Sequence, residues 1–321
     1  MLKYFKHIIV VSLTLFTASC HKGDITLLTH QVDTHTTYDL NNIAFVNDSL
    51  GYICGGSRYT IGMVIRTTDG GKTWSAADSV IPTALYTMTF FSAQEALMGG
   101  FYATLAYTND SARTFSITNL SPGVPISDLS FRNRQQGVAA CGLGYRSGAV
   151  FNTINGGANW TLSYLDSLHS LMGSYYVDDT TVVVCGYGTV LRSHDRGATY
   201  TVVRENGDFY QDVDFVNGTG YAVGYQGEVI KTTDRGATWQ IVRSGNGFFS
   251  SPDHLMGVDF IDENTGYAVG ESGLMIHTGN GGGDWQTVKP FTSERLKAVH
   301  LFSATSGIVV GSGGRAYLFQ Q

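Results

Sequence analysis

Short stretches of alternating apolar and polar residues recur along this chain and are separated by glycine. One type of stretch is represented by SDLSFRN, QDVDFVN and MGVDFID, and a second, more apolar type by VVVCG, GYAVG and GIVVG. Alternation over four to eight residues is typical of half-buried β-strands, and glycine marks the breaks between strands. Long segments with helical periodicity are absent after the first twenty residues. The pattern predicts an all-β domain of many short strands.

A third recurring segment sets the period of the repeat. It begins with Thr or Ser, continues through Asp or Asn to Gly, and ends at a large ring, as in TTDGGKTW and TTDRGATW. The six copies lie 39 to 46 residues apart and end at Trp74, Phe115, Trp160, Tyr200, Trp239 and Trp285. This period, with four strands in each unit, is that of a β-propeller blade.

Counting the two kinds of segment predicts the number of blades and the closure of the ring. The GYAVG-type segment occurs seven times, whereas the Asp-type turn occurs six times, and the chain ends one strand after the last GIVVG. The seventh blade therefore lacks an outer strand at the C-terminus, and residues 25–33 are predicted to supply it. Closure in this way removes an open sheet edge. We expect a seven-bladed propeller of four-stranded antiparallel blades over residues 25–321.

The acidic or amide residue of each Asp-type turn is predicted to be structural. Its side chain can accept hydrogen bonds from backbone N–H groups just ahead, and the following glycine supplies a positive φ. Catalysis requires unlike groups that converge, whereas these groups are alike and spread around the ring. In the second copy Ala112 replaces glycine, so that turn is expected to be the most distorted. The six positions are Asp69, Asp110, Asn155, Asp195, Asp234 and Asn280.

The first twenty residues differ from the rest. Lys3 and Lys6 precede a short apolar run that ends in the small residues before Cys20. The run is too short for a comfortable membrane span. It resembles a bacterial lipoprotein signal, although Thr17 stands where that pattern prefers a larger aliphatic residue. The resemblance implies a signal peptide over 1–19, lipidation of Cys20, a tether over 20–24 and a place in the cell envelope, not the cytoplasm; ordinary secretion is the alternative.

The positions of the cysteines bear on disulfide formation, and the net charge bears on the class of binding partner. Cys54, Cys141 and Cys185 occupy the position that valine fills in the later repeats, so buried free thiols are expected, with a Cys141–Cys185 bridge between adjacent blades as the alternative. The formal net charge is −6 and no basic run appears, which argues against a nucleic-acid partner.

No segment carries a recognisable catalytic or metal-binding motif. HExxH, paired CxxC, a phosphate-binding glycine loop and GxSxG are all missing, and His30 and His35 around Asp33 lack a fourth ligand. No cofactor and no metal are expected. The Asp-type turn is shared with sialidases, but the arginine of their Arg-Ile-Pro segment is replaced here by Val80. A glycosidase needs two carboxylates across a sugar, and nothing in the sequence pairs the four available: Glu205, Asp208, Glu271 and Glu294.

The units GYICGGSRYTIGMVIRTTDGGKTW (51–74) and TGYAVGYQGEVIKTTDRGATWQIV (219–242) resemble the repeats of photosystem II assembly and stability factor propellers. The resemblance covers nearly the whole mature chain and extends to exported bacterial relatives. It implies a seven-bladed propeller that binds other proteins without catalysing a reaction. Those factors present a basic patch to their client, whereas this chain is acidic, so the photosynthetic role is not carried over.

The expected binding surface is the face opposite the Asp-type turns. Loops between the second and third strands, and those leading into each inner strand, should emerge there. Aromatic residues recur in these loops, two of them beside arginine, and two long loops add more rings. We expect several to line the mouth of the central channel, although rings that merely plug it are the alternative. The candidates are Arg58, Tyr59, Phe101, Tyr102, Tyr145, Arg146, Tyr187, Tyr225, Phe209, Tyr210, Phe248 and Phe249.

Two functions follow from this surface. The first is a lipid-anchored binding module, expected to be monomeric, that holds an envelope protein or peptide client. The second is a glycan-directed propeller, lectin-like or hydrolytic, in which the same rings serve as sugar platforms.

Overall fold

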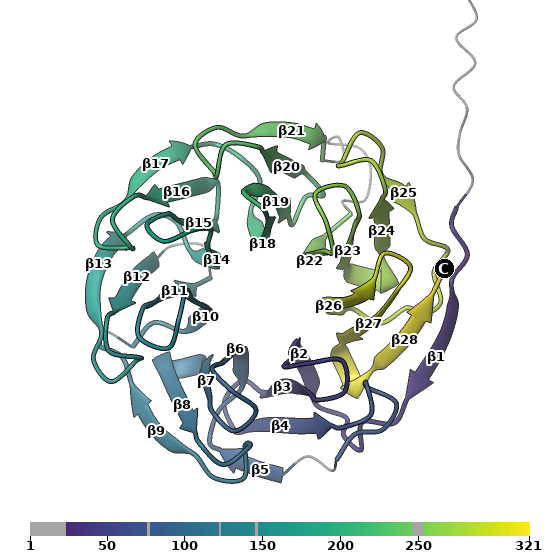
Figure 1. Cartoon of the computed structure of the whole chain (residues 1–321), viewed down its shortest axis with the longest axis horizontal. Helices are drawn as coiled ribbons and strands as arrows, with labels where there is room; N and C mark the ends of the chain where they lie inside the picture. Colours follow the sequence, from purple (N-terminus) through teal and green to yellow (C-terminus); the bar gives the residue numbers. More distant parts are fainter. Residues whose placement is uncertain (1–23, 76–77, 122, 145–146, 246–252) are drawn as a thin grey trace, which may run out of the picture.

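Each repeat forms one four-stranded antiparallel sheet whose strands pair in chain order. The computed structural model describes residues 24–75, 78–121, 123–144, 147–245 and 253–321. The seven sheets surround a central hole like the blades of a propeller, with the first strand of each blade innermost (Figure 1). The predicted seven-bladed all-β fold is confirmed.

The first four blades follow one another without interruption. They comprise β2 (Asp39–Phe45), β3 (Gly51–Ser57), β4 (Ile61–Thr67) and β5 (Asp78–Ile81); β6 (Leu85–Phe90), β7 (Ala96–Gly100), β8 (Thr104–Thr108) and β9 (Ser116–Asn119); β10 (Ile126–Phe131), β11 (Gly137–Leu143), β12 (Ser147–Thr153) and β13 (Thr161–Asp166); β14 (Leu171–Tyr176), β15 (Val182–Gly186), β16 (Thr189–Ser193) and β17 (Thr201–Arg204).

Blades 5 and 6 repeat this order, and blade 7 joins the two ends of the chain. These blades comprise β18 (Tyr210–Val216), β19 (Thr219–Gly224), β20 (Val229–Thr232) and β21 (Gln240–Arg243); β22 (Leu255–Phe260), β23 (Gly266–Gly270), β24 (Met275–Thr278) and β25 (Gln286–Thr287); β26 (Leu296–Ser303), β27 (Ser306–Gly311), β28 (Ala316–Gln320) and β1 (Leu28–Val32). Three short 3-10 turns lie between second and third strands: η1 (Phe101–Ala103), η2 (Glu271–Gly273) and η3 (Ser312–Gly314).

The N-terminal segment closes the ring at two points. β1 pairs antiparallel with β28, from Leu28 opposite Gln320 to Val32 opposite Ala316, as the strand count predicted. Before it, Ile25 runs parallel to the outer edge of blade 6, where its N–H donates to the Thr287 carbonyl at 2.9 Å. The segment therefore ties blade 6 to blade 7 as well as completing blade 7.

The hydrophobic core lies between adjacent blades, not within one. Ile53 and Ile65 of blade 1 pack with Ile308 and Val310 of blade 7, for example, and all four are fully buried. Burial of both faces of each sheet explains why the second strands are continuous apolar runs.

The cysteines belong to these interfaces. Cys54, Cys141 and Cys185 are all buried free thiols, which confirms the prediction and rules out the alternative Cys141–Cys185 bridge. Burial raises the pKa of the Cys141 thiol to about 12. These thiols are therefore packing residues, with no reactive thiolate at neutral pH.

The predicted signal peptide over 1–19 and Cys20 lie outside the described residues. Within the described part of the chain, no helix is long and apolar enough to span a membrane.

Candidate functional site

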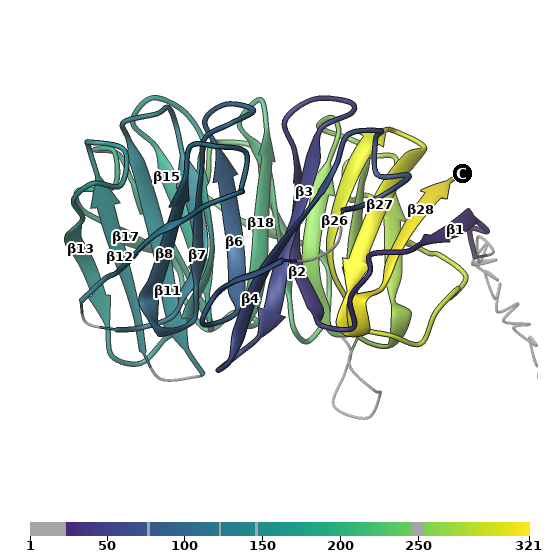
Figure 2. The ribbon, with the colours of Figure 1, turned by 90° about the horizontal axis from the view of Figure 1, so that it is seen from below.

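The two rims of the ring carry different kinds of loop (Figure 2). The Asp-type turns join third to fourth strands and lie beside the loops joining first to second strands, as the 3.0 Å bond from Gly70 N–H to the Ser49 carbonyl shows. On the other rim, the Thr83 hydroxyl of the loop before β6 donates to the Arg58 carbonyl of the β3–β4 loop at 2.8 Å. We call the first rim the Asp-turn face and the second the loop face.

Each Asp-type turn is held by its own side chains. In the first copy, Gly71 N–H donates to Thr67 Oγ1 at 3.0 Å, and Thr73 N–H donates to Asp69 Oδ1 at 2.9 Å. Hydrogen bonds from Thr73 and Thr67 lower the pKa of Asp69 to about 2. The carboxylate is thus engaged within the turn, as a structural role requires.

The second turn keeps this geometry despite Ala112. Its N–H donates to Thr108 Oγ1 at 3.1 Å, and Thr114 N–H donates to Asp110 at 2.9 Å. Ala112 adopts φ 64°, whereas the equivalent glycines have φ between 80° and 87°. The prediction that this turn is distorted is therefore wrong as far as its hydrogen bonds are concerned. These bonds hold Ala112, a non-glycine residue, in the left-handed region.

The ring that ends each Asp-type turn is a wedge between blades. Trp74 is 4% exposed, donates from Nε1 to the Gly71 carbonyl at 3.1 Å, and packs edge-on against Phe45. Its core cluster includes Ile308 of blade 7. Trp74 therefore contributes to the stability of the interface between blades 1 and 7.

On the loop face, one aromatic cluster spans blades 1 and 2. Tyr59 and Tyr102 are 62% and 55% exposed and pack over Phe101, with ring centroids 5.1 and 4.6 Å from that of Phe101. The Arg58 guanidinium lies 5.6 Å from the Phe101 centroid, and a hydrogen bond with Tyr86 raises the pKa of Arg58. Among the described residues, no carboxylate pairs with Arg58. Phe101 itself is 8% exposed, so it supports the cluster from below and is not a surface ring as predicted.

A second group of rings crosses blades 4 to 6 in one line. The centroid distances from His169 to Tyr187, Phe209, Tyr225 and His254 are successively 6.4, 5.2, 6.5 and 3.8 Å. We call these five residues the aromatic ladder. Tyr187 is 42% exposed, and Phe209 and Tyr225 are half-buried.

Backbone hydrogen bonds fix the ladder in place before any ligand arrives. Gly188 N–H donates to the Asp208 carbonyl at 3.0 Å, and Tyr225 N–H donates to the Phe209 carbonyl at 2.8 Å. The Asp208 carboxylate accepts from the N–H groups of Gln226 and Glu228, which braces the next loop. Such preorganisation reduces the entropy lost on binding.

The last glycine of the GYAVG-type segment allows this close packing. A Cβ at Gly186 would lie 2.0 Å from the Ser170 carbonyl oxygen, and one at Gly270 would lie 1.8 Å from that of His254. Only glycine therefore lets the loop entering the inner strand lie against the end of the second strand.

Tyr210 was predicted on this surface and is instead fully buried. It begins β18, at the position before the β-bulge that Leu or Ile fills in the other six inner strands, and its hydroxyl lies 2.7 Å from Arg204 Nε and 2.5 Å from Glu228 Oε1. It is therefore a core residue whose polar end is satisfied within the protein. Four other candidates, Tyr145, Arg146, Phe248 and Phe249, lie outside the described residues.

The mouth of the channel is bordered by residues that the sequence did not single out. Every inner strand has a β-bulge near its start, after the first residue in six strands and after the second residue, Leu40, in β2. The half-buried residues at these bulges are Asn41, Tyr86, Ser127, Met172, Gln211, Met256 and Lys297. The predicted rings in the described part of the chain, apart from Tyr210, lie in the loops that follow the second strands or precede the inner strands.

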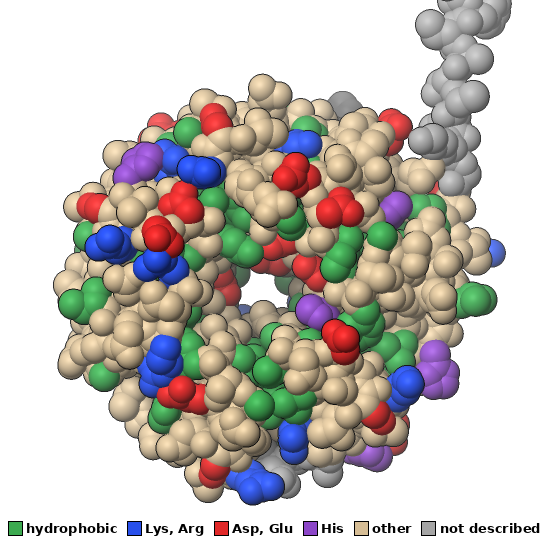
Figure 3. Space-filling view, viewed as in Figure 1, with side chains coloured by type: hydrophobic (Ala, Val, Ile, Leu, Met, Phe, Trp, Pro, Cys, Tyr) green, Lys and Arg blue, Asp and Glu red, His purple; other side chains and the backbone are tan. Residues whose placement is uncertain are grey.

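Deeper in, carboxylates border one side of the channel (Figure 3). The inner edge of each sheet has unpaired N–H groups, and the preceding blade satisfies several of them: Val258 N–H donates to Asp212 at 3.0 Å and Phe260 N–H to Asp214 at 2.8 Å. Burial, with repulsion from neighbouring carboxylates, raises the pKa of Asp212 to about 7. Asp128 and Asp259 make equivalent bonds to Ser174 and Leu301. On the opposite side, Lys297 pairs with Asp39 at 2.7 Å.

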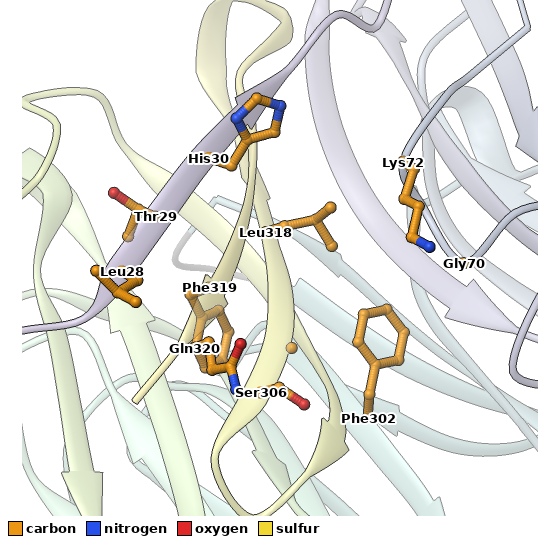
Figure 4. Close-up of a pocket in the computed structure, with 11 residues that line it drawn as sticks. Leu28, Thr29, His30, Gly70, Lys72, Phe302, Ser306, Leu318, Phe319 and Gln320 are labelled. Carbon is orange, nitrogen blue, oxygen red and sulfur yellow. The ribbon is translucent and has the colours of Figure 1, made fainter.

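A shallow pocket also lies where the ring closes. Figure 4 shows Leu318 and Phe302 between β1 and the Asp-type turn that carries Gly70 and Lys72. Its lining is largely apolar, and its charged or titratable residues are Lys72 and His30. No opposing carboxylate is present in this lining, so the pocket lacks paired groups for acid–base chemistry.

Catalytic arrangements are likewise missing among the described residues. His169 Nδ1 lies 2.8 Å from Asp166, but no hydroxyl or thiol completes a triad in the described contacts. Of the four carboxylates considered for glycoside hydrolysis, Asp208 braces a loop and Glu271 pairs with Arg295 at 2.7 Å. No group of three potential metal ligands occurs in the described part of the chain.

Comparisons with known proteins place this geometry in a family. The model of the photosynthesis system II assembly factor YCF48 family matches residues 26–211 and 202–298. Among solved structures, YCF48 bound to a D1 peptide superposes with a TM-score of 0.69 at 15% identity, covering 92% of this chain and 95% of that one. YCF48 from Cyanidioschyzon merolae gives 0.68 at 18% identity, covering 91% and 98%.

The propeller fold itself is shared more widely. The WD40 propeller domain of Doa1 superposes with a TM-score of 0.67 at 15% identity, covering 92% of this chain and 96% of that one. No curated protein sequence matches the chain. The family model spans most of the described propeller, and the chain therefore belongs to the YCF48 family of photosynthesis system II assembly factors.

Proposed function

We propose that this protein is a non-catalytic binding module that holds a peptide segment of another protein on its loop face. The observation that carries this proposal is the aromatic ladder, a partly exposed line of rings whose backbone is already fixed by hydrogen bonds between blades. Tyr is enriched in binding hot spots, and it contributes a large contact area with few rotatable bonds.

The family relationship supports a peptide as the ligand class. A solved YCF48 structure is bound to a D1 peptide, so a propeller of this fold can bind a peptide. At 15% identity, that peptide's own sequence is not transferred to this protein.

The proposed site of action is the cell envelope. The support is the sequence of residues 1–19 and the following Cys20, which resemble a lipoprotein signal. Metabolic labelling with a palmitate analogue tests this: we expect label on the wild type and none on Cys20→Ser. Label retained by Cys20→Ser would contradict lipidation at this residue.

A glycan ligand is the second candidate, favoured by the exposed rings of Tyr59 and Tyr102, which could stack on sugars. A crosslinking pull-down from envelope extracts, run beside a glycan array, separates the two. We expect capture of a specific protein by the wild type, loss of that capture in Tyr187→Ala/Tyr225→Ala, and no glycan signal. Glycan binding that the double variant loses would favour the second candidate, and a double variant that behaves as wild type in both assays would refute the aromatic ladder as the site.

A further inference from the structure

We propose that the aromatic ladder binds an extended peptide in which lysine or arginine alternates with apolar side chains. This inference rests on the proposed function and adds the chemistry of the ligand. Its starting point is the difference in charge between the ladder and the aromatic cluster of blades 1 and 2.

The spacing of the ladder suits an extended chain. Its successive centroids across blades 4 and 5 are 5.2 and 6.5 Å apart. Side chains on one face of an extended strand recur about every 6.6 Å, so alternate residues of a peptide can contact successive rings. The ring faces are also favourable positions for a cation.

The surroundings of the ladder are acidic. The segments that carry it or adjoin it (166–169, 204–209, 225–228, 243–245 and 253–254) contain five carboxylates and two arginines. Both arginines are already paired, Arg204 with Glu228 at 3.0 Å and Arg243 with Asp253. The carboxylates outside these two pairs are Asp166, which contacts His169 Nδ1 at 2.8 Å, and Glu205 and Asp208, so acidic groups outnumber arginines around the ladder and favour a positively charged ligand.

The channel mouth beside the ladder also contains carboxyl groups and flexible apolar side chains. Asp212 lies on β18, three residues after Phe209, and the nearby carboxyl groups of Asp128 and Asp214 give this part of the channel an acidic lining that a cation would favour in its ionised form. The bulge residues of blades 4 and 6, Met172 and Met256, belong to β14 and β22, the inner strands that flank β18. Adaptable thioethers can pack against the aliphatic part of a lysine whose ammonium group points toward the carboxylates.

The aromatic cluster of blades 1 and 2 differs from the ladder in its charge. Arg58 lies over Phe101 and has no carboxylate partner among the described residues, so a cationic side chain would be repelled there. Tyr59→Ala/Tyr102→Ala is therefore a matched control, since it removes two exposed rings from the same face at a site of opposite charge.

Three fluorescein-labelled eleven-residue peptides test the proposal by fluorescence anisotropy. One alternates leucine and lysine, one alternates leucine and glutamate, and one alternates serine and lysine. We expect the leucine–lysine peptide to bind at least about tenfold more tightly than either of the others, which corresponds to about 1.4 kcal/mol. Its affinity should fall as salt rises from 50 to 200 mM, because screening weakens charge attraction.

The variants localise the binding. Tyr187→Ala/Tyr225→Ala should weaken the leucine–lysine peptide at least about tenfold, and Tyr59→Ala/Tyr102→Ala less than about twofold. Equal effects of the two double variants would overturn the proposal. Tighter binding of the leucine–glutamate peptide, lost in the ladder variant, would refute the cationic ligand yet leave the ladder as a peptide site. If no peptide binds, the proposal fails, and the pull-down decides the proposed function separately.

Discussion

The two rims of this propeller use aromatic residues for opposite purposes. On the Asp-turn face, Trp74 and its equivalents repeat with the period of the blades and pack against the clusters between them, Trp74 buried and the other five half-buried. On the loop face, Tyr59, Tyr102 and Tyr187 are 42% to 62% exposed and follow no strict period. Regular repetition thus accompanies packing, and departures from the repeat accompany surface available to a partner.

The same contrast applies to acidic residues. Asp69 accepts hydrogen bonds within its own turn, and its pKa is lowered to about 2. Asp212 accepts one bond from the next blade beside other carboxylates, and its pKa is raised to about 7. One residue type therefore stabilises a turn at one rim, and in the channel it forms a group of neighbouring carboxyl groups that retain their protons to higher pH.

Replacing the buried aromatic residue that ends an Asp-type turn should have the largest effect on the free energy of unfolding. We expect Trp74→Ala to lower the free energy of unfolding by about 3–5 kcal/mol, because it removes a buried aromatic side chain and leaves a cavity. Urea denaturation followed by circular dichroism measures this. A loss below about 1 kcal/mol would show that the wedge is not a major part of the interface.

Removing one hydroxyl from an Asp-type turn should cost less. Thr232 is buried, and its Oγ1 accepts the N–H of Gly236 at 3.0 Å and donates to Asp234 at 2.7 Å. Thr232→Val keeps the shape but leaves that N–H without its acceptor, so a loss of about 1–3 kcal/mol is expected by denaturation. Unchanged stability would mean that the turn is held by other contacts.

The channel carboxylates should make stability depend on pH in a defined direction. A pKa of about 7 for Asp212 and about 6 for Asp214 exceeds the ordinary value of about 3.9, so the stability linked to protonation is lost as pH rises through 6 to 7. Asp212→Asn removes this titration. Relative to wild type, the variant should be more stable at pH 8 than at pH 5.5, by on the order of 1 kcal/mol, because solvent screens a partly buried group. A pH-independent difference would contradict the raised pKa.

The exposed rings of the loop face should contribute least to folding. We expect Tyr59→Ala/Tyr102→Ala to change the free energy of unfolding by less than about 0.5 kcal/mol, since surface substitutions away from special features rarely exceed that. Thermal melting beside Trp74→Ala provides the comparison. A loss comparable to that of Trp74→Ala would remove the distinction between the faces.

The fold could be predicted because three kinds of repeated segment each indicate the same structural unit. The Asp-type turn, the GYAVG segment and the alternating inner strand all indicate one blade, and the mismatch of seven against six predicts the closure by β1. Turns and strands of this kind depend on residues close together in the chain, so a single sequence is enough to predict them.

The site was predicted less completely because it depends on contacts between repeats. Tyr210 appears in a long aromatic loop, yet it starts an inner strand; aligning it with Leu171 and Leu255 would have indicated burial. His169, His254 and the bulge residues Met172 and Met256 were not selected, because nothing local marks a residue that the next blade brings beside a ring.

The most direct test of the division between the faces is the affinity of the leucine–lysine peptide for two variants, each checked to be folded. The account predicts that Tyr187→Ala/Tyr225→Ala loses at least about tenfold in affinity while its stability stays near that of wild type, and that Thr232→Val keeps its affinity while its stability falls. Lost affinity in Thr232→Val, with wild-type affinity in the ladder variant, would contradict it.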